Sequence, residues 1–364
     1  MTLHLSGLGT AVPPRVLEQT DAAELSRAFC AADAKQARAL RMLYGRSGVD
    51  SRNAVVLRAD HGTLQERMPF YPAASGPDDR GPTTGERMAQ YEAEAPRLAE
   101  AASRRALEKA PTPAGAITHL VTVSCTGFFS PGLDATLIDA LGMSPTVHRT
   151  HVGFMGCHGA LNGLRVASSQ AEEAEGARVL LCAVELCSLH FAYGWDPDMM
   201  VANTLFADGA AAVVGVPQRD DEPRGWSVRA HGTFLMPLSG EAMSWRIGDH
   251  GFRMTLSAAV PELIRTNLGG WLIIWLKTQG LSINDIGSWA VHPGGPRILE
   301  AVEDALSLEN GTLDVSREVL RGHGNMSSPT VLFILERLRE AEAALPCVAL
   351  AFGPGLVVEA MLVV

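Results

Sequence analysis

Apolar segments with no polar alternation recur along this chain and constrain its fold more than any other feature. They read "THLVTVSCT" (118–126), "RVLLCAVEL" (178–186) and "GAAAVVGV" (209–216). Each has the length of a buried strand, and helical patterns at 132–142 and 157–171 fall between them. A strand that is apolar on both faces must be covered on both sides. The pattern therefore predicts an α/β fold with sheets between layers of helices.

The same succession begins again after residue 225. It predicts a helix at 258–279, a strand at 288–293, and helices at 295–307 and 328–341. The apolar C-terminal stretch contains Gly353, Pro354 and Gly355, which favours two buried strands around a turn over a membrane span. Two passes of one pattern predict a duplicated architecture with halves at 1–225 and 226–364.

The first hundred residues follow a different course. They predict a strand at 1–10, a helical segment around 19–44, a loop at 71–85 rich in Pro and Gly, and a long helix at 86–110 perturbed by Pro96. The start of the chain has no basic segment followed by a long apolar one, so we expect no signal peptide.

Composition narrows the class of protein. An apolar fraction of 47% and a charged fraction of 19% are typical of a globular protein. The net charge of −10 argues against nucleic acid or an anionic membrane as a partner. Six cysteines without a CxxC pair favour free thiols. We therefore expect a cytoplasmic protein with no membrane span.

Cys157 lies in "GFMGCHGALNGL" (153–164), where glycines surround the predicted start of a helix. The helix dipole there lowers the pKa of a thiol, and backbone N–H groups can bind an oxyanion. A buried structural thiol is the more common role of a free cysteine. A metal site is disfavoured, because the adjacent Cys157 and His158 diverge on a helix and no pair has zinc-type spacing. From these residues alone the role of the thiol stays open.

Two polar residues follow predicted strands or turns in the second half. His292 ends a buried strand before a Pro-Gly-Gly turn, and strand ends collect catalytic groups in α/β folds. Asn325 lies in "GHGNMSSPTVLFIL", with Ser327 or Ser328 as the expected N-cap of the next helix and His323 expected to be exposed. A histidine can polarise a thiol, and an amide can hold a carbonyl oxygen. Structural roles for both residues are also consistent with the sequence.

Other residues carry weaker signals. Phe206 and Asp208 in "TLFADGAAAVV" suggest a core aromatic and a turn cap. Cys125 stands at a strand end, whereas Cys182 and Cys187 are expected in the core.

Cys157, His292 and Asn325, in this order and each in a glycine-rich turn, resemble the type III polyketide synthases, the chalcone and stilbene synthase-like family. "HPGGPRILEAVEDAL", "GNMSSPTVLFIL", "TLFADGAAAVV" and "AFGPGLVVEAML" are similar to four segments of that family. The resemblance implies a thiolase-like αβαβα sandwich of two α/β halves, a homodimer, and coenzyme A thioesters as substrates with no tightly bound cofactor.

The resemblance also implies roles for individual residues. Cys157 accepts an acyl group, and His292 keeps the Cys157 sulfur as a thiolate. His292 and Asn325 together hold the malonyl carbonyl. Loss of CO₂ then creates an enolate that extends the acyl chain. Phe206 is implied to be a gatekeeper. The residues implied to line the cavity are His158, Cys125, Cys187, His190, Trp245 and Met254. The residues implied to bind coenzyme A are Arg38, Arg41, Arg46, Gly294, Gly295 and Arg297.

The chain departs from the plant pattern at several of these positions. His158 stands where plant members usually have Phe, Ser130 where Met is common, and Trp245 and Met254 where Gly and Phe are frequent. The pattern is more similar to bacterial members that make alkylpyrones or alkylresorcinols, although Trp245 would shorten the cavity. Lys35 and Arg52 extend the basic cluster of Arg38, Arg41 and Arg46, for which a solvated helix face is the alternative.

Other enzyme classes share parts of this signature. A ketoacyl-acyl-carrier-protein synthase III has the same Cys, His and Asn and is the main alternative. A papain-like hydrolase also uses Cys, His and Asn, but its local Cys motif is missing. A non-catalytic binding protein is the third possibility, and it predicts no preferential alkylation of Cys157.

Overall fold

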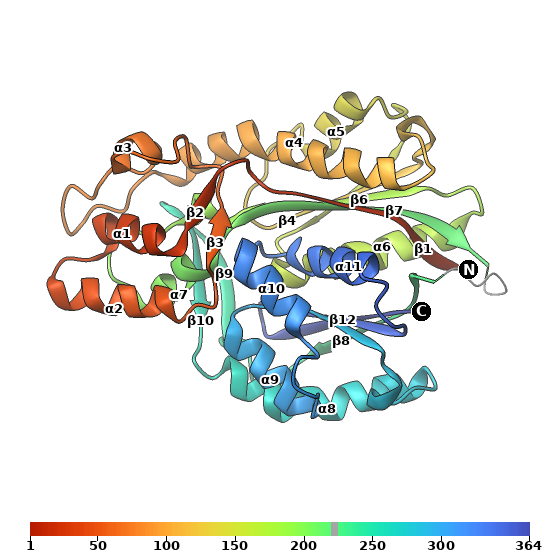
Figure 1. The fold of residues 1–364 in the computed structure, drawn as a ribbon. Coiled ribbons are helices and arrows are strands. Elements are labelled where there is room, and N and C mark those ends of the chain that lie inside the picture. Colours follow the sequence, from red (N-terminus) through yellow and green to blue (C-terminus); the bar gives the residue numbers. More distant parts are fainter. Residues whose placement is uncertain (220–224) are drawn as a thin grey trace.

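Layers of helix and sheet alternate through the computed structural model, which describes residues 1–219 and 225–364 (Figure 1). Helices α4 and α5 cover one outer face, α6 and α11 lie between two sections of sheet, and α8 and α9 cover the other outer face. This succession of α, β, α, β and α layers confirms the predicted thiolase-like sandwich.

Within the described residues the main sheet has nine strands in the order β11-β12-β13-β8-β1-β7-β6-β4-β5. Strands β1 and β8 join the two sections through only a short pairing, Leu3 with Val228 and His4 with Ser227. The strands of this sheet are β1 (Thr2–Ala11), β4 (His119–Ser124), β5 (His148–Gly153), β6 (Val179–Leu186), β7 (Asp208–Gln218), β8 (Ser227–Leu235), β11 (Ser288–Val291), β12 (Cys347–Gly353) and β13 (Val357–Val363).

Two small sheets complete the strands, β2 (Val16–Glu18) with β3 (Ser51–Asn53) and β9 (Met243–Gly248) with β10 (Gly251–Leu256). The helices are α1 (Gln19–Cys30), α2 (Ala34–Gly45), α3 (Leu64–Arg67), α4 (Thr84–Lys109), α5 (Leu133–Leu141), α6 (Gly159–Glu173), α7 (Pro197–Leu205), α8 (Val260–Thr278), α9 (Pro296–Leu306), α10 (Asp314–His323) and α11 (Thr330–Glu340). Short 3₁₀ turns lie at Ala114–Ala116, Gly156–His158, Cys187–His190 and Ile283–Asp285.

Local capping explains where the expected helices begin and end. The single helix predicted around 19–44 is two helices, because Asp33 accepts a hydrogen bond from the backbone N–H of Gln36 at 2.8 Å and starts α2. A capping box of Thr83 and Glu86 starts α4, which continues through Pro96. Helices α7 and α10 were not predicted from the sequence.

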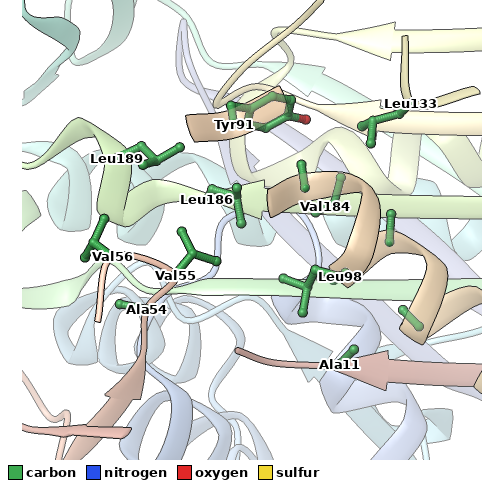
Figure 2. Close-up of a cluster of buried hydrophobic side chains, with 14 of the residues drawn as sticks. Ala11, Ala54, Val55, Val56, Tyr91, Leu98, Leu133, Val184, Leu186 and Leu189 are labelled. Atoms are coloured by element: carbon green, nitrogen blue, oxygen red, sulfur yellow. The ribbon is translucent and has the colours of Figure 1, made fainter. Parts of the chain in front are cut away.

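Three buried clusters fill the spaces between the layers. The outer cluster packs α4 on the sheet, and Figure 2 shows Tyr91 and Leu98 of α4 near Val184 and Leu186 of β6. The central cluster joins α6 and α11 to the opposite faces of the strands, and a third cluster packs α8 and α9 on β12 and β13. Because side chains alternate along a strand, Val184 and Leu186 face α4 while Glu185 between them faces the central layer.

The C-terminal segment forms two buried antiparallel strands, as expected. In the described part of the chain, no helix is both long enough and apolar enough to cross a membrane.

Candidate active site

The three residues singled out from the sequence line one cavity. Cys157 comes from the turn before α6, His292 from the residue after β11, and Asn325 from the segment after α10. The cavity has a volume of about 40 Å³, and Phe206 also lines it. The tertiary fold therefore gathers groups that lie far apart in the chain, as strand ends in α/β folds commonly do.

A tight turn places the Cys157 thiol at the N-terminus of α6. Gly156 has a φ of 72°, and a Cβ atom there would lie 2.5 Å from Cδ of Pro354. Only glycine combines that conformation with such a close approach, so Gly156 is required where the chain turns into the helix.

Burial controls the protonation of Cys157. It raises the pKa of the Cys157 thiol to about 11, and hydrogen bonds to Ser327 and Asn325 oppose this only in part. The direction is opposite to the one expected from the helix N-terminus, because desolvation of a buried thiolate outweighs the helix dipole. The resting thiol is therefore protonated at neutral pH.

Alkylation by iodoacetamide should reveal this raised pKa. We expect the rate of Cys157 modification, measured by mass spectrometry of the peptide, to keep rising through about pH 9 because only the thiolate reacts. Free glutathione in the same buffers corrects for the reagent. A rate that reaches its plateau near neutral pH would contradict the raised pKa.

The imidazole of His292 is buried and makes no hydrogen bond to the described residues. Burial, together with charge on His158, lowers the pKa of His292 to about 3, so the ring is neutral. Among the described residues, neither ring nitrogen has a hydrogen-bond partner. A buried polar group without a partner is costly in a folded protein, which indicates that His292 is held for a ligand.

Asn325 is held by its neighbours on three sides. Its backbone N–H donates to the carbonyl of Leu205 at 2.8 Å, and its carbonyl accepts from the N–H of Ala207 at 2.9 Å. Its side-chain Oδ1 accepts from the N–H of Ser327 at 2.8 Å. Because the amide oxygen is already engaged, the orientation leaves the Nδ2 hydrogens available to the cavity.

The serines beside Asn325 do not have the expected capping role. Pro329 precedes α11 without a side-chain cap, Ser327 has a φ of 56°, and Ser328 donates to Glu185 at 2.6 Å. The apolar start of the helix suggested a cap, but the turn instead serves Asn325 and Glu185.

Glu185 was not singled out from the sequence. It is fully buried and accepts hydrogen bonds from the N–H of Cys125 at 2.9 Å and from Thr126 Oγ1 at 2.7 Å, besides the one from Ser328. Burial raises the pKa of Glu185 despite these donors. It ties β4 and β6 to the segment before α11 close behind the thiol. A lone carboxylate inside "RVLLCAVEL" was the signal that could have revealed it.

The expected cavity residues do surround the thiol. Phe206 lines three separate cavities, the one shared by the three polar residues and two more of about 40 and 20 Å³. Of the other expected cavity residues, Cys125, Cys187, His190, Trp245 and Met254 each line at least one of these cavities, whereas His158 lines none of them. Trp245 donates from Nε1 to the carbonyl of Cys125 at 2.8 Å, which fixes the large indole across the cavity. Phe206 and Trp245 therefore divide the interior into small compartments.

The two other histidines of the motifs have structural contacts. His158 is buried, lies 2.6 Å from Asn162 through Nδ1, and packs so closely on Gly353 that a Cβ atom there would be 2.2 Å away. His323 is half-buried rather than exposed, because it ends α10 and lies 3.0 Å from Arg337 and against Phe333.

The basic residues separate into two groups. Arg38, Arg41, Arg46 and Arg297 are exposed, and the loop after Arg46 packs against the first turn of α9 through Gly48 and Pro296. Gly294 lines the cavity of Cys157. Arg52 is instead buried and donates to the carbonyls of Asn203 and Phe206 at 2.9 and 2.8 Å. Arg52 thus anchors the backbone at Phe206.

Asp208, which was expected to cap a turn, is fully buried at the start of β7. It accepts hydrogen bonds from the N–H groups of Val55 and Ser188, both at 2.7 Å. Burial raises the pKa of Asp208 to about 6.

Comparison with known proteins agrees with this geometry. Residues 2–217 match the family description "Chalcone and stilbene synthases, N-terminal domain", and residues 228–364 match the C-terminal domain. The chain belongs to the chalcone and stilbene synthase family. It is therefore a type III polyketide synthase, an acyltransferase that forms carbon–carbon bonds.

Curated and structural relatives of this synthase extend over nearly its whole length. A 1,3,6,8-tetrahydroxynaphthalene synthase of Streptomyces peucetius is 36% identical, over 98% of this chain and 92% of that protein. An alpha-pyrone synthesis polyketide synthase-like protein of Mycobacterium tuberculosis is 32% identical, over 98% and 90%. The crystal structure of PKS-I from the brown alga Ectocarpus siliculosus has a TM-score of 0.90 at 29% identity, over 100% of this chain and 98% of that one.

Proposed function

We propose that this synthase loads an acyl group from coenzyme A onto Cys157 and extends it with malonyl-CoA to a pyrone- or resorcinol-type product. The observation that carries the proposal is the convergence of Cys157, His292 and Asn325 on one cavity. The names of the tetrahydroxynaphthalene and alpha-pyrone relatives support this product class. The fixed indole of Trp245 limits the space beside Cys157 for a starter.

In the loading step, the Cys157 sulfur attacks the acyl thioester while its proton passes to His292. The coenzyme A thiolate leaves and takes that proton from His292, which returns the imidazole to its neutral form. Because the pKa of His292 is lowered, the resting ring is neutral and has a nitrogen lone pair for the thiol proton, and the same low pKa favours return of that proton to the leaving thiolate.

In the extension step, the C–CO₂ bond of malonyl-CoA breaks and its electron pair forms an enolate. His292 and Nδ2 of Asn325 donate hydrogen bonds to the enolate oxygen. The enolate carbon then attacks the acyl group on Cys157, so a C–C bond forms and the thiolate leaves. Release of CO₂ removes the need for a strong base, and the buried cavity excludes water.

Exposed basic residues would hold the coenzyme A phosphates. Arg46 and Arg297 flank the packed junction between the α2–β3 loop and α9, with Arg38 and Arg41 farther along α2. We further propose a homodimer, since β5 is an edge strand and Phe128, Phe154 and Met155 expose apolar side chains. Free cysteines throughout the described chain are consistent with a cytoplasmic enzyme.

Exchange of His292 for alanine tests the enolate site. We expect the rate of CO₂ release from malonyl-CoA to fall by about a hundredfold or more, because a positioned donor at the developing oxyanion is lost. His323→Ala is the matched control, since His323 lies on α10 against Arg337 and outside the cavity.

The product assay decides between this function and the alternative. Purified protein incubated with malonyl-CoA and an acyl-CoA series should release CO₂ and give pyrones or resorcinols by mass spectrometry. Turnover of malonyl-acyl-carrier protein but not malonyl-CoA would identify a ketoacyl synthase III instead. Equal loss of activity in the two histidine variants would count against the proposed role of His292.

A further inference from the structure

The buried Arg52 of β3 binds the chain segment that connects α7 to β7. Its guanidinium donates to the carbonyls of Asn203 and Phe206 at 2.9 and 2.8 Å, and also to the carbonyl of Thr204. The last carbonyls of a helix have no partner inside the helix, and a cation is favourable beside them. Arg52 therefore fixes one side of residues 203–207, which we call the 203–207 segment.

Asn325 binds the same segment through the backbone groups that alternate with these. The carbonyl of Leu205 accepts from the N–H of Asn325, and the N–H of Ala207 donates to the Asn325 carbonyl, so that Phe206 and Asn325 form a short parallel bridge. The backbone of Phe206 is extended, and successive carbonyls of an extended chain point to opposite sides. Arg52 and Asn325 therefore hold opposite sides of one segment.

The turn that leads from α10 to this amide packs on the same arginine. Gly324 has a φ of 72°, and a Cβ atom there would lie 2.8 Å from the carbonyl oxygen of Leu205 and 3.6 Å from Cβ of Arg52. Just before β3, the N–H of Asp50 donates to the carbonyl of Arg321 at 2.8 Å. The chain around Arg52 thus supports the segment and the turn together.

Burial of this guanidinium is costly, which argues for a specific role. Its Nε has no hydrogen-bond partner among the described residues, and burial lowers the pKa of Arg52. Gln19 aligns the group, because Oε1 of Gln19 accepts from Arg52 and its Nε2 donates to the carbonyl of Thr204 at 2.9 Å. Several carbonyls along one segment require a planar fork of donors, which an apolar side chain of similar size does not offer.

We propose that Arg52 is a positioning residue for the enolate step, because it holds the 203–207 segment so that Nδ2 of Asn325 faces the substrate oxygen. Arg52 is not among the described residues that line the cavity of Cys157, so it acts through Asn325 and not by contact with the substrate. This inference rests on the proposed function, since it concerns the enolate that Asn325 stabilises.

Arg52→Met tests the role of the donors, since methionine fills much of the same space without them. We expect kcat for CO₂ release from malonyl-CoA to fall about tenfold with KM changed by less than about threefold, because a misplaced donor stabilises the oxyanion less. Acyl loading of Cys157, measured without malonyl-CoA by intact-protein mass spectrometry, should change by less than about threefold, because loading does not use Asn325. Arg52→Lys keeps one charged donor and should lose about threefold in CO₂ release.

A double-mutant cycle tests whether Arg52 acts through the amide. In an Asn325→Ala background, Arg52→Met should lower CO₂ release by less than about a further twofold, because the group that it positions is already gone. Losses that multiply in the double variant would overturn the inference.

Arg87→Met is the matched control. Arg87 is also fully buried, also lies over a tyrosine ring, and donates to the carbonyls of Leu189 and Phe191 at 2.6 and 3.0 Å, outside the 203–207 segment. We expect the ratio of CO₂ release to acyl loading to stay at the wild-type value in this variant. An equal fall of the ratio in the control, or an unchanged ratio in the Arg52 variants, would overturn the positioning role.

Two further outcomes separate the possible failures. If circular dichroism shows that Arg52→Met does not fold, Arg52→Lys decides by the same ratio. If the wild-type enzyme neither loads an acyl group nor releases CO₂ from malonyl-CoA, the proposed function fails, which differs from a wild-type enzyme that does both while the ratio ignores Arg52.

Discussion

Replacement of Cys157 by alanine will abolish acyl loading and polyketide formation while malonyl-CoA decarboxylation continues. Without the sulfur no thioester forms, and loss of a covalent nucleophile lowers turnover by about ten-thousand-fold or more. His292 and Asn325 still line the cavity in this variant, so the enolate keeps its donors. We expect CO₂ release within about tenfold of the wild-type rate.

Intact-protein mass spectrometry measures loading, and trapping of released CO₂ measures decarboxylation. Cys347→Ala is the matched control, because Cys347 is also fully buried and burial also raises the pKa of its thiol to about 11, but it lies in β12 outside the cavity. An acyl adduct at the wild-type level in Cys157→Ala would exclude Cys157 as the nucleophile. Equal loss of both reactions would show that the two steps do not separate as proposed.

Acid will unfold the protein well above the pH at which its carboxylates titrate. Burial lowers the pKa values of His190 and His292 to about 3, and those of His231 and His323 to about 4. The unfolded chain takes up protons below about pH 6.5 and the folded chain does not. The stability that these neutral histidines contribute is therefore complete above about pH 6.5 and is lost as pH falls, by about 1.4 kcal/mol per pH unit for each residue.

A buried carboxyl group opposes this effect but is outnumbered. The pKa of Asp208 is raised by burial to about 6, so its contribution is complete below its ordinary pKa of 3.8 and is lost as pH rises. Burial also raises the pKa of Glu185, so two carboxyl groups oppose four histidines. The free energy of unfolding therefore falls on acidification. We expect the free energy of unfolding to fall by at least about 3 kcal/mol between pH 7 and pH 5.

Urea unfolding followed by circular dichroism at the two pH values measures this loss. Glutamine at position 190 can still donate and accept hydrogen bonds but does not titrate, so His190→Gln should reduce the loss by about 2 kcal/mol. His61→Gln, a change at an exposed residue, is the control. A free energy of unfolding that does not change between the two pH values would contradict the buried neutral histidines.

The α/β class and most strands were predictable because their signal is local. A continuous apolar run such as that of β6 needs cover on both faces whatever surrounds it. The division between α1 and α2 was missed because a single capping aspartate, Asp33, decides it. Helix α10 was missed because its short polar pattern is also typical of a loop.

The site was predictable in its residue types but not in its electrostatics. Cys157, His292 and Asn325 each stand in a turn at the end of a regular element, which is visible in the sequence. The helix N-terminus suggested a lowered thiol pKa, yet burial by segments hundreds of residues away raises it. Arg52 seemed part of a basic surface, and its carbonyl partners near Phe206 were beyond any local pattern.

By itself, the sequence determined the layered α/β fold, the family and the identities of the three convergent polar residues, because strand burial and glycine turns depend on neighbours along the chain. Only the tertiary structure decided how these groups are protonated, how Glu185 joins the segments behind the thiol, and how Arg52 anchors the backbone at Phe206. Desolvation and packing depend on which distant segments surround a group, and those neighbours exist only after folding.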